Sequence, residues 1–262
     1  MPIADIAGLP VRYEDSGGDG PVVLLSHGFF SDHTAFDPQV EALAPHYRCI
    51  RWDQRGFGGT PAPLPFTLWD AADDAVELLD HLGVDEATFV GASQGGFVAL
   101  RAALAHPDRV GALVLIASAA DADPPDARAG YEAVLGALRH GSPDERTAVF
   151  ARVARLLLGD DDLARRWIPR WQALDRDELG HAAGATMERN DLSDHLEDID
   201  CPALVVHGAA DEVITVDRAR ALQAGLPDCE DLVVIKGAGH APNLSAPDAV
   251  NQAMRAFLDD LG

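Results

Sequence analysis

The segment Ala87-Thr-Phe-Val-Gly-Ala-Ser93-Gln-Gly-Gly-Phe97 decides how this chain of 262 residues folds. Residues 87–92 form a short apolar run typical of a buried strand, and residues 97–105 are apolar almost all round, as in a helix buried on most sides. The small residues around Ser93 allow a tight strand-to-helix turn that presents its hydroxyl. The N-terminus of the following helix offers free N–H groups and a favourable dipole to a developing negative charge. The segment therefore predicts a nucleophilic serine at the carboxyl end of a strand.

The turn within this segment, Gly91-Ala92-Ser93-Gln94-Gly95, is a G-x-S-x-G pattern. A chance glycine turn is the alternative interpretation, because the pattern alone is common. The apolar strand directly before it and the apolar helix directly after it supply the context that a nucleophile turn requires. We therefore interpret Ser93 as a nucleophile.

Short apolar runs alternate with longer helical patterns on both sides of this segment, which predicts an α/β fold with a mostly parallel central sheet and helices on both faces. The expected strands are residues 11–14, 21–26, 47–53, 87–92, 110–117, 203–207 and 231–235. Two helices have recognisable start signals. Thr67-Leu-Trp-Asp70 has the capping-box pattern, and Ser245 and Pro247 are expected to start a last helix whose apolar face includes Leu261.

The alternation of strands and helices stops between about residues 123 and 198. This stretch has helical patterns only, for instance at residues 149–157, with breaks at residues 159–162 and at Pro169. We interpret it as a helical cap inserted into one core domain. The expected division is a core of residues 1–122 and 199–262 and a cap of residues 123–198.

A serine hydroxyl is a weak nucleophile unless a base removes its proton. His240, in Lys236-Gly-Ala-Gly-His240, follows the last expected strand and can serve as that base. Asp211, in His207-Gly-Ala-Ala-Asp211, follows the strand before it and can orient the imidazole. A loop aspartate is usually a turn former and a loop histidine is usually solvated, but the order Ser93, Asp211, His240 at successive carboxyl ends of strands is the order expected for this fold.

Two further motifs carry a family resemblance. His27-Gly28-Phe29-Phe30 matches a His-Gly oxyanion turn, and the segment Asp53-Gln-Arg-Gly-Phe-Gly-Gly-Thr60 matches an Asp-x-Arg-Gly-x-Gly-x-Ser loop, with threonine where serine is usual. With these motifs the sequence resembles the α/β-hydrolase family over nearly its whole length. The resemblance implies that the backbone N–H groups of Phe29 and Gln94 form an oxyanion hole. Within the family, the core resembles 3-oxoadipate enol-lactonases and related small esterases.

The triad and the resemblance together predict a serine hydrolase that cleaves a small carboxylic ester or lactone through an acyl-enzyme. The same triad also supports hydrolysis of a carbon–carbon bond, a perhydrolase or haloperoxidase activity, or acyl transfer to an amine or alcohol. A hydrolase-fold receptor that binds a small molecule with little turnover is a further alternative. Fold and triad cannot choose among these functions, because the pocket decides the substrate.

The chain has 43 acidic and 20 basic residues, for a formal net charge of −23. Such a surface repels phosphate backbones and anionic lipid, so neither nucleic acid nor a membrane is an expected partner. The sequence contains no Walker A loop, no complete G-x-G-x-x-G, no His-Glu-x-x-His and no Cys-x-x-Cys motif. No cofactor and no metal are therefore expected. The sequence shows no secretory signal and no apolar run of membrane length, which favours a cytoplasmic location. Whether the chain forms a homo-oligomer stays open.

Several side chains have both a functional and a structural interpretation. Arg55 can bind a substrate carboxylate, but the expected role is to brace its own loop. The arginines of the cap, among them Arg152, Arg155, Arg165 and Arg166, invite the same functional idea. Sixteen acidic residues accompany them, so most of these arginines are expected to form surface ion pairs. Trp167 and Trp171 can line a pocket or pack within the cap. Cys49 and Cys201 are expected to act as small buried hydrophobic residues.

Overall fold

A computed structural model describes residues 2–229 and 231–261 of the chain. Its centre is a sheet in which eight strands are described, in the order β1-β2-β4-β3-β5-β6-β7-β8. From β4 to β8 all neighbours are parallel, as predicted. These strands are β3 (Val22–Ser26), β4 (Arg48–Trp52), β5 (Ala87–Ala92), β6 (Val110–Ile116), β7 (Ala203–Gly208) and β8 (Leu232–Ile235).

An antiparallel hairpin forms one edge of the sheet. It consists of β1 (Ile3–Ile6) and β2 (Leu9–Asp15), and β2 pairs antiparallel with β4. Ala7 and Gly8 connect the two strands, with φ angles of 49° and 85°. Positive φ at both positions is typical of the tight turns that match the twist of a two-residue hairpin. The prediction placed a strand at residues 11–14 and missed β1, which has only four residues.

Helices cover both faces of the sheet, as predicted. One apolar cluster joins α2 (Leu68–His81), α3 (Gln94–Ala105) and α8 (Val216–Gly225) to Leu24, while another joins α1 (Asp37–Leu43) and α10 (Pro247–Asp260) to Val23 and Leu25. Alternate residues of β3 thus face opposite helix layers, which follows from the two-residue period of a strand. Burial on both faces explains why the core strands are continuous apolar runs. The short elements are η1 (His33–Phe36), η2 (Pro107–Arg109), η3 (Ser193–Asp198) and α9 (Pro242–Ser245).

The two predicted helix starts have different outcomes. Thr67 and Asp70 form the expected reciprocal capping box of α2. The prediction that Ser245 starts the last helix is wrong, because Ser245 ends α9 and its hydroxyl donates to the carbonyl of Ala241, at 3.0 Å. Pro247 is the first residue of α10. Leu261, predicted on the apolar face, instead follows the helix and is exposed.

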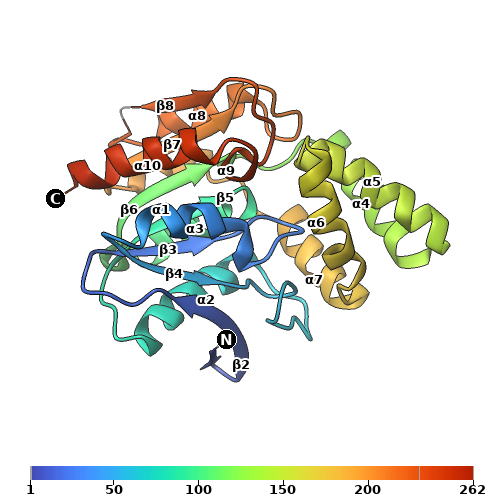
Figure 1. The fold of residues 1–262 in the computed structure, drawn as a ribbon, viewed down its shortest axis with the longest axis horizontal. Helices are drawn as coiled ribbons and strands as arrows, with labels where there is room; N and C mark the ends of the chain where they lie inside the picture. The colour runs from blue at the N-terminus through green and yellow to red at the C-terminus, as the bar shows by residue number, and fades with distance from the viewer. Residues whose placement is uncertain (1, 230, 262) are drawn as a thin grey trace.

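Four helices occupy the sequence between β6 and β7. They are α4 (Pro125–His140), α5 (Pro143–Leu157), α6 (Asp161–Gln172) and α7 (Arg176–Met187). Figure 1 shows them together at one side, beyond the ends of the strands. They share an apolar cluster with Phe30 and Phe57, which lie on loops of the core. The cap boundaries at residues 123 and 198 stay a prediction. The positions of α4 to α7 are consistent with it.

Pro169 was expected to break a helix, but it lies inside α6. A proline in a helix interior removes one backbone hydrogen bond, so other contacts must hold the helix together. Trp167 and Trp171 supply them, because both are buried in the cap cluster and the indole N–H of Trp171 donates to the carbonyl of Phe30. In the described part of the chain, no helix has the length and apolar character needed to cross a membrane.

Candidate active site

Ser93 lies in the sharp turn between β5 and α3. Its φ and ψ are 50° and −113°, a strained combination for a residue other than glycine. The turn presses against its neighbours, since a Cβ on Gly95 would lie 1.9 Å from the carbonyl oxygen of Ser26, and one on Gly91 would lie 2.3 Å from Gly95. The two glycines are therefore required by close backbone approach, and they allow the turn to present Ser93.

The structure brings His240 and Asp211 to Ser93. His240 Nε2 lies 2.9 Å from Ser93 Oγ, and His240 Nδ1 lies 2.8 Å from Asp211 Oδ2. A carboxylate can only accept, so Nδ1 carries the proton and Nε2 is free to accept from the serine hydroxyl. Asp211 and His240 are both buried and follow β7 and β8 respectively. The arrangement has the geometry that general-base activation of a serine needs.

Asp211 is held as a carboxylate by several donors. Its Oδ1 accepts from the N–H groups of Val213 and Ile214, at 2.8 and 3.0 Å. Burial alone would raise the pKa of Asp211, but hydrogen bonds from His207, His240 and the Ile214 N–H outweigh burial and hold this pKa well below its usual range. A stable carboxylate hydrogen-bonded to an imidazole is the arrangement in which an aspartate orients a histidine that serves as a base.

His207 stands four residues before Asp211, and no role was predicted for it from the sequence. His207 is completely buried at the end of β7, and its Nε2 lies 2.8 Å from the carbonyl of Ile214 and 3.3 Å from Asp211 Oδ2. Because the Ile214 carbonyl accepts, Nε2 carries the proton and also faces the carboxylate. His207 thus links both ends of the Asp211 turn. A histidine at the end of an otherwise apolar strand was the signal available in the sequence.

A small cavity opens onto Ser93. Its volume is about 40 Å³. The cap contributes Leu157, Leu158 and Trp171 to its wall, and the oxyanion turn contributes Phe29. None of the described residues that line it is an arginine, lysine, aspartate or glutamate. The space beside Ser93 is therefore small and largely apolar, and His240 also lines it.

Of the two predicted oxyanion residues, Phe29 lines this cavity and Gln94 directly follows Ser93. Gln94 is the first residue of α3, where an N–H group has no partner within its own helix. Phe29 lines the cavity beside Ser93, in a turn where Phe30 adopts a φ of 61°. A Cβ on Gly28 would lie 3.2 Å from the carbonyl of Ala92, so this turn lies directly against the nucleophile turn.

The arginines considered as substrate ligands lie elsewhere. Arg55 binds Asp74 on α2 with two hydrogen bonds of 2.5 and 2.7 Å, so it braces its loop. Arg165 pairs with Asp162, and Arg166 pairs with Asp37. None of these arginines lines the cavity at Ser93. Cys49 is buried as expected and Cys201 is partly exposed, and all three cysteines are free.

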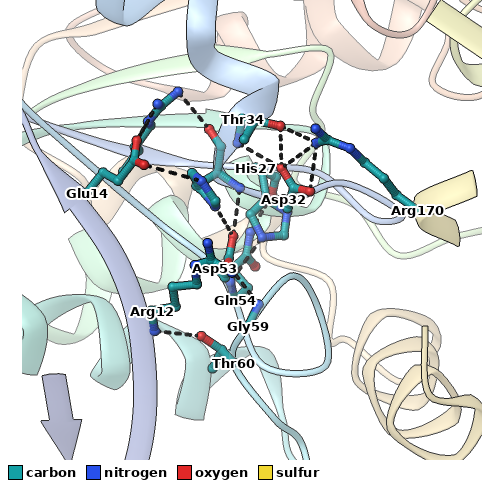
Figure 2. A network of polar contacts seen from close by, with 12 residues as sticks. Arg12, Glu14, His27, Asp32, Thr34, Asp53, Gln54, Gly59, Thr60 and Arg170 are labelled. Atoms are coloured by element: carbon teal, nitrogen blue, oxygen red, sulfur yellow. Dashed lines mark hydrogen bonds and ion pairs between the residues drawn. The ribbon is translucent and has the colours of Figure 1, made fainter. Parts of the chain in front are cut away.

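Asp32, His33 and Asp53 form the one group with metal-ligand spacing among the described residues. Asp53 already accepts three hydrogen bonds, from the backbone and the ring Nδ1 of His33 at 2.8 and 2.7 Å and from the Gly59 N–H at 2.8 Å. Asp32 accepts from Thr34 and pairs with Arg170, as Figure 2 shows. These donors leave the carboxylates little capacity for a cation. The group instead ties the predicted Asp53 loop to the start of η1, which follows the predicted oxyanion turn.

Hydrogen bonding also defines the Asp53 loop. A Cβ on Gly58 would lie 2.1 Å from Asp53 Oδ2, so the carboxylate can reach the loop backbone only beside a glycine. Thr60 accepts from the Arg12 N–H at 2.9 Å. A serine hydroxyl can accept in the same way, which explains why threonine is compatible with this position.

Comparison with known proteins places the chain in a family. Residues 21–247 match the family model described as the alpha/beta hydrolase fold. The chain therefore belongs to the α/β-hydrolase family, as its motifs indicated. The fold and the family both support a hydrolase.

Individual relatives show which hydrolases the chain is similar to. RutD from Caulobacter vibrioides, named as a carbamate hydrolase, is 30% identical over 99% of this chain and 98% of its own. An enol-lactonase structure from Burkholderia xenovorans has a TM-score of 0.88 with 26% identity, covering 98% of this chain and 100% of its own. A thermophilic esterase structure from Thermogutta terrifontis has a TM-score of 0.87 with 29% identity, covering 97% of this chain and 94% of the esterase chain. The predicted resemblance to enol-lactonases and small esterases is confirmed.

Proposed function

We propose that the protein is a serine hydrolase that cleaves small, uncharged carboxylic esters or lactones. Ser93 is the nucleophile, His240 the general base and acid, and Asp211 the group that orients the imidazole. The observation that carries the proposal is the continuous chain of contacts from Asp211 through His240 to Ser93, at 2.8 and 2.9 Å. These contacts end at the cavity of about 40 Å³ that Ser93 and His240 line.

The first half of the reaction forms an acyl-enzyme. Nε2 of His240 takes the hydroxyl proton while Ser93 Oγ attacks the carbonyl carbon, and the Asp211 carboxylate stabilises the resulting imidazolium. The carbonyl oxygen becomes an oxyanion, which the N–H groups of Phe29 and Gln94 bind. Collapse of this intermediate breaks the bond to the alcohol. His240 gives its proton to the departing alkoxide.

The second half repeats the same steps with water. His240 removes a proton from a water molecule as the water oxygen attacks the acyl carbon. The oxyanion forms again at Phe29 and Gln94, and its collapse releases the carboxylic acid. His240 returns the proton to Ser93 Oγ, so the enzyme is restored without a cofactor.

The cavity supports the proposed substrate class. Ligand pockets are usually about 300–1,000 Å³ in volume, whereas the cavity at Ser93 is about 40 Å³. A bulky acyl group therefore does not fit this arrangement of the cap. An anionic acyl group would be buried without a counter-charge, because the cap arginines lie elsewhere, and such burial is costly. A short neutral acyl group fits both the volume and the lining.

Two measurements test the proposal. The first is intact mass after treatment with a small fluorophosphonate, with Ser93→Ala as the control, because the probe needs an activated serine but little substrate specificity. The second compares hydrolysis of methyl butyrate and monomethyl succinate, which differ chiefly in one negative charge. We expect one adduct on the wild type, none on the variant, and a clear preference for the neutral ester.

The outcomes also separate the alternatives. A folded wild type without an adduct would overturn the serine mechanism and favour a receptor. An adduct with preference for the anionic ester would keep the mechanism and overturn the substrate class. Peracid formed faster than ester is cleaved would favour a perhydrolase, and acyl transfer to an amine or alcohol in preference to water would favour a transferase. Cleavage of a β-diketone in place of esters would favour carbon–carbon bond hydrolysis.

A further inference from the structure

A chain of buried polar side chains connects the cap to the oxyanion turn. Thr186, on α7, donates its hydroxyl to Gln94 Oε1 at 2.7 Å, and Gln94 Nε2 donates to Gln54 Oε1 at 3.0 Å. Gln54 in turn donates its side-chain amide to the carbonyl of His27 and its backbone N–H to His27 Nε2, the latter at 3.0 Å. All four residues are 5% exposed or less. Buried polar networks of this kind hold a unique arrangement when every member is satisfied.

The direction of the hydrogen bonds follows from their donors. Because the Gln54 N–H can only donate, His27 Nε2 accepts, and the ring proton is on Nδ1. His27 Nδ1 then donates to the carbonyl of Gly28, at 2.8 Å. Burial lowers the pKa of His27, which agrees with a neutral ring. Figure 2 shows Gln54 directly beside His27.

This chain of contacts includes both residues that carry a proposed oxyanion donor or its peptide group. The Gly28 carbonyl belongs to the same planar peptide group as the Phe29 N–H, so a hydrogen bond to the carbonyl also sets the direction of the N–H. Between Thr186 and Gln54, Gln94 is held through both polar atoms of its side-chain amide, and its own backbone N–H is the second proposed donor. None of Thr186, Gln54 and the Gln94 side chain lines the cavity at Ser93. Their effect on the reaction must therefore be indirect.

Helix α7 packs against the core loop that follows β4. A Cβ on Gly56 would lie 3.0 Å from the Glu178 carbonyl, and His181 Nδ1 lies 2.8 Å from the carbonyl of Ala62. These contacts seat α7 on the same loop that carries Gln54. The Thr186 hydroxyl also lies 3.1 Å from the carbonyl of Ala182 in its own helix, so its single proton has two acceptors. The contact with Gln94 exists only while α7 remains docked.

We propose that Thr186 is a positioning residue through which the docked cap sets the two oxyanion donors, by way of Gln94, Gln54 and His27. This inference rests on the proposed function. The cap then acts on the chemical step as well as enclosing the substrate. Substrate binding in the cavity does not depend on Thr186, whereas stabilisation of the oxyanion does.

The test uses Thr186→Val, which keeps the shape of the side chain but leaves Gln94 Oε1 without its donor. Complete loss of one oxyanion donor costs about 10²–10³ in kcat, so a displaced donor is expected to cost about tenfold. KM for methyl butyrate is expected to change less than twofold. Thr186→Ser restores the hydroxyl and is expected to recover kcat. Thr147→Val is the matched control, because this exposed cap threonine donates only within its own helix, to Pro143 at 2.9 Å.

A double mutant shows whether the effect passes through Gln94. In Gln94→Met the acceptor is absent, so adding Thr186→Val is expected to change kcat less than twofold. If Thr186→Val does not fold, Gln94→Met alone carries the test and is expected to lower kcat about tenfold. The inference would be overturned if the wild type is active and either folded variant keeps a kcat within twofold of the wild-type value. It would also be overturned if Thr186→Val lowers kcat by the same factor in the wild type and in Gln94→Met. A wild type with no esterase activity and no adduct at Ser93 would overturn the proposed function as well.

Discussion

Replacing Trp171 is expected to change which acyl chains the protein accepts. The indole of Trp171 lines the cavity of about 40 Å³ at Ser93 and also two neighbouring cavities of about 230 and 460 Å³. It is held there by its N–H contact with the carbonyl of Phe30 and by ring contacts with Phe30 and Phe150, at centroid distances of 5.3 and 6.1 Å. Trp171 is therefore the shared wall that keeps the space beside the nucleophile small.

Trp171→Ala removes most of this wall. Each methylene that enters the enlarged apolar space contributes about 0.8 kcal/mol, which corresponds to about a fourfold gain in kcat/KM. From methyl acetate to methyl hexanoate, which differ by four methylenes, the preference is expected to shift by about two orders of magnitude in favour of the longer ester. The same substitution is expected to reduce the free energy of unfolding by ~3–5 kcal/mol, because a large buried ring is lost.

The assay titrates the acid released from methyl esters of increasing chain length. The ratio of kcat/KM for hexanoate to that for acetate is taken on each preparation, so a partly unfolded variant does not distort it. Trp171→Phe should give a smaller shift in the same direction. Trp167→Phe is the matched control, since Trp167 lies on the same helix but does not line the cavity at Ser93. The reasoning would be refuted if folded Trp171→Ala had the same hexanoate-to-acetate ratio as the wild type. It would also be refuted if Trp167→Phe shifted this ratio as much as Trp171→Phe does.

Three further predictions concern the triad, the Asp53 loop and the nucleophile turn. Ser93→Ala should lower kcat by about 10⁶ and Asp211→Asn by about 10⁴, so single-turnover kinetics that reversed this order would contradict the assignment. Hydrogen bonds from His33 overcome the effect of burial and lower the pKa of Asp53, so its carboxylate stabilises the fold above about pH 4 and loses this effect as the pH falls. Urea unfolding should therefore show a stability gap between the wild type and Asp53→Asn that narrows from pH 6 to pH 3. Gly95→Ala should fail to give a cooperative unfolding transition, because its Cβ would lie 1.9 Å from a backbone oxygen.

The sequence predicted those features that depend on local constraints. The nucleophile turn was recognisable because a buried strand and a buried helix flank it in the sequence and because Gly91 lies against the backbone of Gly95, only four residues away. The parallel strands were recognisable because burial on both faces makes them continuous apolar runs. Strand β1 was missed because four residues of alternating exposure carry too weak a pattern. Pro169 misled the prediction because packing of the tryptophans on either side outweighs its effect on the helix.

By itself, the sequence determined the fold, the nucleophile turn and the order of Ser93, Asp211 and His240, since the carboxyl ends of parallel strands meet at one edge of a sheet. Only the tertiary structure decided what surrounds these residues. The small cavity joins Phe29, Ser93 and Trp171 from distant parts of the chain, and the contact between Thr186 and Gln94 joins residues 92 positions apart. Such contacts depend on how four cap helices pack onto the core, and no local pattern in the sequence specifies that packing.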